Sequence, residues 1–91
     1  MPYILLIIYS FTTDYIALPC KTEKEAIEKL DEYLNTEIET VKNESGYEPI
    51  KIRHDETETE LVYESDKAFI DEDSDKARYK VIEIGHGCQT R

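Results

Sequence analysis

Four residues in this chain have side chains that suit nucleophilic or metal chemistry, namely Cys20, Cys88, His54 and His86. The run Gly85-His86-Gly87-Cys88 places the imidazole of His86 near the thiol of Cys88, an arrangement that can lower a thiol pKa. That run lies in the last seven residues, where chains are commonly poorly ordered, and no group that would orient a base accompanies it. Paired spacings such as Cys-x-x-Cys, which zinc sites use, do not occur. We therefore expect no catalytic residue, no metal site and no cofactor, and hence no enzyme.

The two cysteines lie far apart in the sequence, and we expect no secretory signal, since no Lys or Arg precedes the apolar run from Ile4 to Ile8. A distant pair of this kind predicts two reduced thiols in a reducing compartment, with a structural disulfide as the alternative. The longest apolar run, Ile4 to Ile8, falls far short of the ~20 residues that cross a bilayer. The sequence thus predicts a cytoplasmic protein with no membrane partner.

One segment resembles the start of a calcium loop. Residues 71–75 read Asp-Glu-Asp-Ser-Asp, but the loop also requires Gly at its sixth position and a bidentate Glu at its twelfth. Those positions hold Lys76 and Ile82, so the sequence excludes an EF-hand. Loose binding of a divalent ion by the clustered carboxylates remains an alternative.

Charge is the most informative feature of the sequence. The 91 residues contain 21 Asp and Glu against 11 Lys and Arg, a net charge of −10, which excludes binding to nucleic acid by neutralising its phosphates. Residues 55–75 hold ten acidic side chains and one lysine, and these are the first candidate contacts with a partner: Asp55, Glu56, Glu58, Glu60, Glu64, Asp66, Asp71, Glu72, Asp73 and Asp75. At 100° per residue, four further glutamates share the face of a predicted helix that points away from its apolar stripe: Glu25, Glu28, Glu32 and Glu39.

The elements that must position these side chains follow from periodicity. A capping box at Thr22 to Glu25 and apolar residues at three- and four-residue spacing predict an amphipathic helix over about 23–43. Strands are predicted at about 3–11, 15–20, 47–53, 59–64 and 77–84, with Pro19 indicating an edge strand. Residues 68–70 form a possible further short strand, and 85–91 form a tail. The sequence predicts a single α+β domain over 1–91, ββα followed by two or three strands, with the helix packed on a mainly antiparallel sheet.

Branched residues fill both faces of the strand that contains Ile4 to Ile8, whereas one helix covers only one face of a sheet. Burying each Leu or Ile is worth roughly 1.5–3 kcal/mol, so the second face needs a cover. Long side chains from the later strands are one possible cover. A second copy of the chain, or another partner, is the other.

Small, strongly acidic α+β domains without catalytic motifs resemble the phage-borne anti-defence inhibitors, which include anti-CRISPR and anti-restriction proteins that imitate DNA. The residues that carry this resemblance are the cluster from Asp55 to Asp75 and the four helix glutamates. It implies a non-catalytic inhibitor that occupies the basic nucleic-acid-binding groove of a larger host protein, such as a CRISPR-Cas nuclease, in the bacterial cytoplasm. The alternative is an oligomerising structural or accessory protein that uses the apolar second face of its sheet, the acidic residues serving solubility alone.

Overall fold

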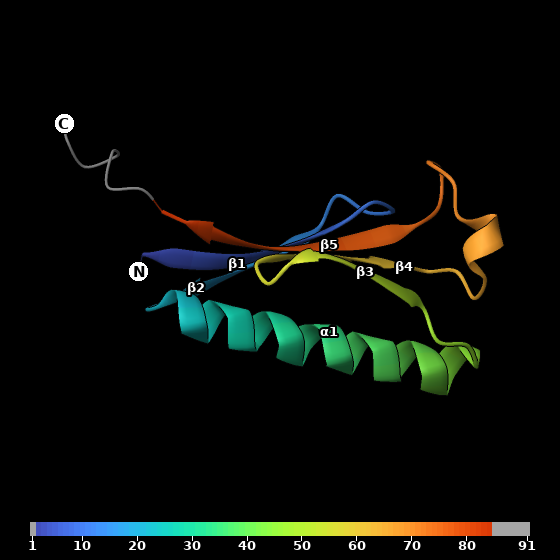
Figure 1. The fold of residues 1–91 in the computed structure, drawn as a ribbon, viewed down its shortest axis with the longest axis horizontal. Coiled ribbons are helices and arrows are strands. Elements are labelled where there is room, and N and C mark those ends of the chain that lie inside the picture. The colour runs from blue at the N-terminus through green and yellow to red at the C-terminus, as the bar shows by residue number, and fades with distance from the viewer. Residues whose placement is uncertain (1, 85–91) are drawn as a thin grey trace.

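Five antiparallel strands form one sheet, and a single long helix packs against it (Figure 1). The computed structural model describes residues 2–84. Along the chain the elements are β1 (Tyr3–Tyr9), β2 (Tyr15–Cys20), α1 (Glu23–Ser45), β3 (Ile50–Asp55), β4 (Glu58–Val62), the 3-10 helix η1 (Lys67–Phe69) and β5 (Lys76–Glu83). The predicted α+β architecture, ββα followed by further strands, is confirmed. The predicted tail at 85–91, with its His86 and Cys88, lies outside the described residues.

Strand order in the sheet is β2-β1-β5-β4-β3, so β5 inserts between β1 and β4. Leu5 lies opposite Val81, and Ile7 lies opposite Tyr79, which places the β-branched and aromatic side chains of β1 and β5 against each other. Strands β1 and β5, which are far apart in sequence, therefore lie side by side within the sheet. Such pairing buries the apolar run of β1 most completely, as the sequence of that strand requires.

Helix α1 is bounded by two local signals. Thr22 accepts a hydrogen bond from the backbone N–H of Glu25 at 3.0 Å, as the capping box predicts, but the Glu25 carboxylate accepts from the N–H of Lys21 at 2.8 Å and not from that of Thr22. At the other end Gly46 adopts a left-handed conformation with φ of 78°, and its N–H donates to the Lys42 carbonyl. The helix is two residues longer than the predicted 23–43.

Several strand boundaries differ from those predicted from the sequence, because they depend on contacts with other parts of the chain. The first strand ends at Tyr9 and not at residue 11. The N–H of Ser10 still donates to the Lys76 carbonyl at 2.9 Å, but the Lys76 N–H donates to the Ser10 hydroxyl at 2.9 Å in place of a backbone carbonyl, so the ladder stops there. The predicted short strand at 68–70 is wrong, since Asp66 caps a 3-10 turn there by accepting from the N–H of Ala68 at 2.9 Å. Strand β3 begins at Ile50, after Pro49, and not at residue 47.

Helix α1 covers one face of the sheet. Alternate residues of β1, β4 and β5 and the last residue of β2 are buried together with residues of α1. This core consists of Leu5, Ile7, Cys20, Ala26, Leu30, Leu34, Leu61, Ala77, Tyr79 and Val81. The guanidinium of Arg53 also lies on this side, donating to Thr59 at 2.9 Å and to Asp31 of α1 at 3.0 Å. It thereby ties the outer strand β3 to the helix.

The two outer strands of the sheet are β2 and β3. Pro19 lies in β2, which confirms the predicted edge position, and the strand spans Tyr15–Cys20 as predicted. Proline is tolerated there because an edge strand needs backbone donors on one side only. In β3 the pairing with β4 shifts register between Arg53 and Asp55, the signature of a β-bulge.

Candidate functional site

The outward face of α1 carries the predicted row of helix glutamates. Glu28, Glu32 and Glu39 are exposed, because helical periodicity places them opposite the buried Leu30 and Leu34. Two of the three have exposed lysine partners: Lys29 lies 3.6 Å from Glu32, and Lys42 lies 3.6 Å from Glu39. Glu25 differs from the others, since its carboxylate is engaged at the helix N-terminus.

The connection between β4 and β5, residues 63–75, is the second acidic region. It holds six carboxylates and one lysine, and all but the half-buried Glu64 are exposed. Asp66 and Asp71 shape the chain: Asp71 accepts from the N–H of Asp73 at 2.9 Å, while its own N–H donates to the Ser74 hydroxyl at 2.9 Å. The exposed carboxylates with no ion pair to any of residues 2–84 include Glu72, Asp73 and Asp75.

The remaining acidic residues of the predicted cluster lie elsewhere. Asp55 and Glu56 lie at the hairpin turn that joins β3 to β4, at the opposite end of β4 from the connection; five residues of strand separate them, about 17 Å. The hydroxyl and N–H of Thr57 both donate to Asp55 at 2.7 Å, and these bonds hold the pKa of that carboxyl below its usual value. The structure therefore divides residues 55–75 between three places.

Glu58 and Glu60 belong to the face of the sheet that α1 leaves open. Their partners in the register are Lys80 and Arg78 of β5. Two guanidinium nitrogens of Arg78 lie 2.8 and 3.2 Å from one oxygen of Glu60, and the imidazole of His54 lies 3.4 Å from the other. These bonds, that of Arg78 foremost, hold the pKa of Glu60 below its usual value. Glu60 thus contacts two basic side chains, more than any other carboxylate of the predicted cluster does among the described residues.

Net charge is confined to two elements of the fold. Helix α1 has eight carboxylates against three lysines, a net of −5, and residues 63–75 have six against one, also −5. All other residues together balance, with seven acidic and seven basic side chains. The whole net charge of −10 therefore belongs to α1 and to the β4–β5 connection, which we call the two acidic elements.

On the open face of the sheet, β1 and β5 carry apolar and basic side chains. Register places Leu6 and Ile8 of β1 beside Lys80 and Arg78 of β5, and Ile4 beside Ile82. No helix formed by residues 2–84 covers this face (Figure 1), and Ile8 remains 46 % exposed while Tyr15 on the edge strand is 66 % exposed. A shallow hollow of about 530 Å³ lies at the β1–β2 end, lined in part by Leu6, Ile8 and Tyr15. The later strands do not supply a complete cover for β1.

Among residues 2–84 the structure shows neither a cluster of metal ligands nor an accessible thiol. Within 2–84, no three His, Cys, Asp or Glu side chains come together in a way that could hold a metal ion. Cys20 is buried, and burial raises the pKa of its thiol, which disfavours the reactive thiolate. The one α-helix of this part of the chain has no apolar stretch long enough to cross a membrane.

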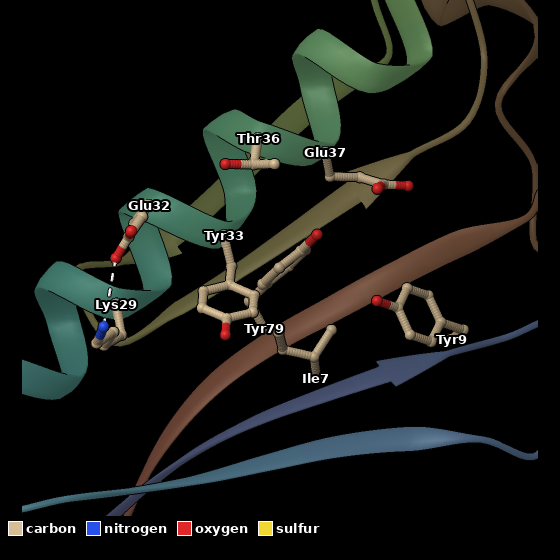
Figure 2. Close-up of a pocket in the computed structure, with 8 residues that line it drawn as sticks. All are labelled: Ile7, Tyr9, Lys29, Glu32, Tyr33, Thr36, Glu37 and Tyr79. Carbon is tan, nitrogen blue, oxygen red and sulfur yellow. Dashed lines mark ion pairs between the residues drawn. The ribbon is translucent and has the colours of Figure 1, made fainter. Parts of the chain in front are cut away.

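A cleft between α1 and the sheet was missed by the sequence reasoning. It is lined in part by Tyr9, Tyr33, Glu37 and Tyr79 (Figure 2). One signal was present: at 100° per residue Glu37 falls within the stripe of Leu30, Leu34 and Val41, where a carboxylate is out of place. The tyrosines gave no such signal, because β1 and β5 come together only in the fold.

Comparison of the chain with protein-family models, with curated proteins and with solved structures finds no match. The features of the structure that bear on function are the acidic elements, the open face and the cleft.

Proposed function

We propose that this protein is a non-catalytic inhibitor that binds the basic nucleic-acid-binding groove of a larger protein through its two acidic elements. The observation that carries the proposal is the confinement of the net charge to α1 and the β4–β5 connection. Charge that served solubility alone would be interspersed over the surface, and crowding it into two elements adds repulsion that folding must overcome.

The dimensions of α1 support imitation of a nucleic-acid backbone. From Glu25 to Glu39 the helix rises about 21 Å, which is the axial length of about six base pairs of duplex DNA. A groove lined by Lys and Arg responds mainly to the field and spacing of negative charge, so carboxylates along this length compete with phosphates for it. A CRISPR-Cas nuclease in the cytoplasm of a phage-infected bacterium is the example we favour.

The test is competition between this protein and DNA for a purified Cas nuclease. Binding is expected to weaken steeply between about 50 and 500 mM salt, because salt screens charge-driven association. Guide RNA or target DNA is expected to displace the protein from the nuclease. The charge reversals Glu28→Lys, Glu72→Lys and Asp73→Lys, combined, alter exposed side chains that have no hydrogen bond to any described residue. We expect this triple variant to lose binding while its circular dichroism spectrum is unchanged.

A matched control separates position from net charge. Combining Asp14→Lys, Glu48→Lys and Glu83→Lys changes the net charge by the same amount at exposed positions outside the acidic elements. The control is expected to retain most of the affinity. Equal losses in the two triple variants would reject the acidic elements as the contact surface, and no loss in either would reject the proposal.

A second candidate function, self-association through the open face, is favoured by the exposure of Ile8, Tyr15 and Ile82. Sedimentation velocity distinguishes the two candidates, because burial of apolar surface gives a dimer that persists in 1 M salt. In that case Ile8→Asp is expected to yield monomers. Phe69→Asp, at a residue that is 67 % exposed outside the sheet, is the matched control and is expected to leave the dimer intact.

A further inference from the structure

The cleft between α1 and the sheet has a volume of about 270 Å³, and three tyrosines are among the eight residues that line it (Figure 2). Tyr9 comes from β1 and Tyr79 from β5, while Tyr33 and Glu37 come from successive turns of α1. The volume is many times the ~10–15 Å³ that one water requires, and it lies just below the range of drug-sized ligand pockets. The cleft therefore has room for a small ligand or a single side chain.

Glu37 places a negative charge in this cleft. Its carboxylate accepts one hydrogen bond, from the Tyr63 hydroxyl at 2.8 Å, and it has no ion pair to any residue of the described part. Lys29, the cation on the cleft wall, is paired with Glu32 at 3.6 Å. The cleft walls thus carry two carboxylates against one ammonium group, an excess of one negative charge.

The hydroxyl groups of Tyr9 and Tyr79 line the same cleft as Glu37. Tyr79 is buried as a residue, with 1 % of its surface exposed, and its hydroxyl makes no hydrogen bond to residues 2–84. No fully buried side-chain oxygen or nitrogen of these residues lacks a partner, so this hydroxyl is accessible from the open space of the cleft. In Figure 2 that hydroxyl points towards the space beside Glu37, and the hydroxyl of Tyr9 points into the same space from the other side. Burial, followed by the Glu37 charge, raises the pKa of Tyr9 and of Tyr79, so both phenols remain protonated and neutral. Their oxygens are available as acceptors.

We propose that the cleft binds a primary ammonium group. Such a group has three N–H donors, which match one oxygen of Glu37 and the hydroxyl oxygens of Tyr9 and Tyr79. The aromatic rings that line the cleft add attraction for a cation. An anion is repelled by the excess negative charge, and a neutral ligand leaves Glu37 without a counter-ion. This site is independent of the two acidic elements and does not rest on the inhibitor function proposed for them.

The binding experiment uses the full chain and two probes of the same chemistry. Butylammonium chloride represents a free small amine, and Nα-acetyl-lysine methylamide represents a lysine side chain of a polypeptide. Titrations are followed by calorimetry and by NMR of the tyrosine rings. Saturable binding of either probe, with shifts at Tyr9 and Tyr79, supports the proposal. Binding of butylammonium alone identifies small amines as the source, and binding of the lysine derivative at least as tightly identifies polypeptide lysines.

Variants and salts supply the controls. Glu37→Gln keeps the shape of the side chain and an acceptor for Tyr63, so loss of about tenfold or more in affinity is expected from removal of the charge. Glu39→Gln removes a charge two residues away on the outward face and is expected to bind as the unaltered protein does. If Glu37→Gln does not fold, Tyr79→Phe tests the same geometry and is expected to weaken binding severalfold. Tetramethylammonium, which has no N–H donor, is expected to bind at least tenfold more weakly.

Two results would overturn the assignment. One is a response to both ammonium probes that is non-saturating and equal to that of sodium chloride. The other is unchanged affinity in folded Glu37→Gln or in Tyr79→Phe.

Discussion

The contact between Glu60 and Arg78 is expected to stabilise the fold, so its removal should lower Tm. Glu60→Gln removes the charge of a carboxylate whose side chain is 18 % exposed. This carboxylate accepts two hydrogen bonds from the Arg78 guanidinium, at 2.8 and 3.2 Å. Hydrogen bonds to charged groups contribute about 1.5–3 kcal/mol, but Arg78 is 53 % exposed, so solvent screening reduces the expected loss to about 1 kcal/mol. With an unfolding entropy of about 2.1 cal/mol/K per residue, this corresponds to a fall in Tm of about 5 °C.

The same contact predicts a dependence on pH. In the folded protein the pKa of Glu60 lies below its usual value of 4.5, chiefly because Arg78 donates to the carboxylate, with His54 contributing. A group whose folded pKa is depressed stabilises the fold fully above its unfolded pKa, and that stabilisation is lost as pH falls through the folded pKa. The difference between the unaltered protein and Glu60→Gln is therefore expected at pH 7 and should shrink progressively below about pH 4.5.

Urea and thermal unfolding, followed by circular dichroism at several pH values between 3 and 7, measure both effects. Glu72→Gln is the control, because this carboxylate lies in the same acidic stretch of sequence but is exposed and has no ion pair to a described residue. We expect Glu72→Gln to match or slightly exceed the stability of the unaltered protein. A Glu60→Gln variant that is equally stable at pH 7, or whose deficit is unchanged at pH 3, would refute the reasoning.

Three further predictions concern the helix and the acidic connection. Thr22→Ala removes the hydroxyl that caps α1 and should cost about 1 kcal/mol in urea unfolding; Thr40→Ala, at a mid-helix residue, is the comparison. Gly46→Ala should cost about 1 kcal/mol, because φ is 78° there although no atom lies within 4 Å of an added Cβ; an unchanged urea midpoint would contradict this. Asp73→Asn should raise Tm by at most about 2 °C in low salt and not in 1 M NaCl, where repulsion is screened; a decrease in Tm would count against crowding.

The parts of the fold that sequence predicts well are those fixed by neighbouring residues. Helix α1 begins and ends at signals within four residues of its ends, and its apolar stripe has a regular period. The short segment around Phe69 shows that local sequence is insufficient where an element depends on a distant partner. Its apolar residues are typical of a strand, but a strand needs a partner, and none of the described strands pairs with it. The local bond from Ala68 to Asp66 forms a turn in its place.

The acidic cluster shows why proximity in sequence did not predict proximity in space. Residues 55–75 cross the molecule from a hairpin turn, along β4, to the connection at its far end. Alternation in β4 then turns Glu58 and Glu60 towards basic residues of β5, more than 15 positions later in the chain. The balance of charge on that strand pair depends on the antiparallel register, which the sequence alone does not reveal.

Tyr9, Glu37 and Tyr79 come from three elements that are far apart in sequence, so their convergence depends on the insertion of β5 beside β1. Only the position of Glu37 on the apolar stripe of α1 indicated a polar feature beneath the helix. A buried tyrosine is ordinarily interpreted as core, and its hydroxyl becomes informative only when its surroundings are known.

The outer strands determine how this sheet can grow. An unprotected edge with an apolar face beside it is a template for strand addition and, ultimately, for fibrils. Here Pro19 removes a backbone donor from β2, and the register shift near His54 bends β3, so an incoming strand meets an interrupted ladder on either side. Concentrated solutions of the folded protein are therefore expected to resist amyloid formation, and any assembly is directed to stacking of faces.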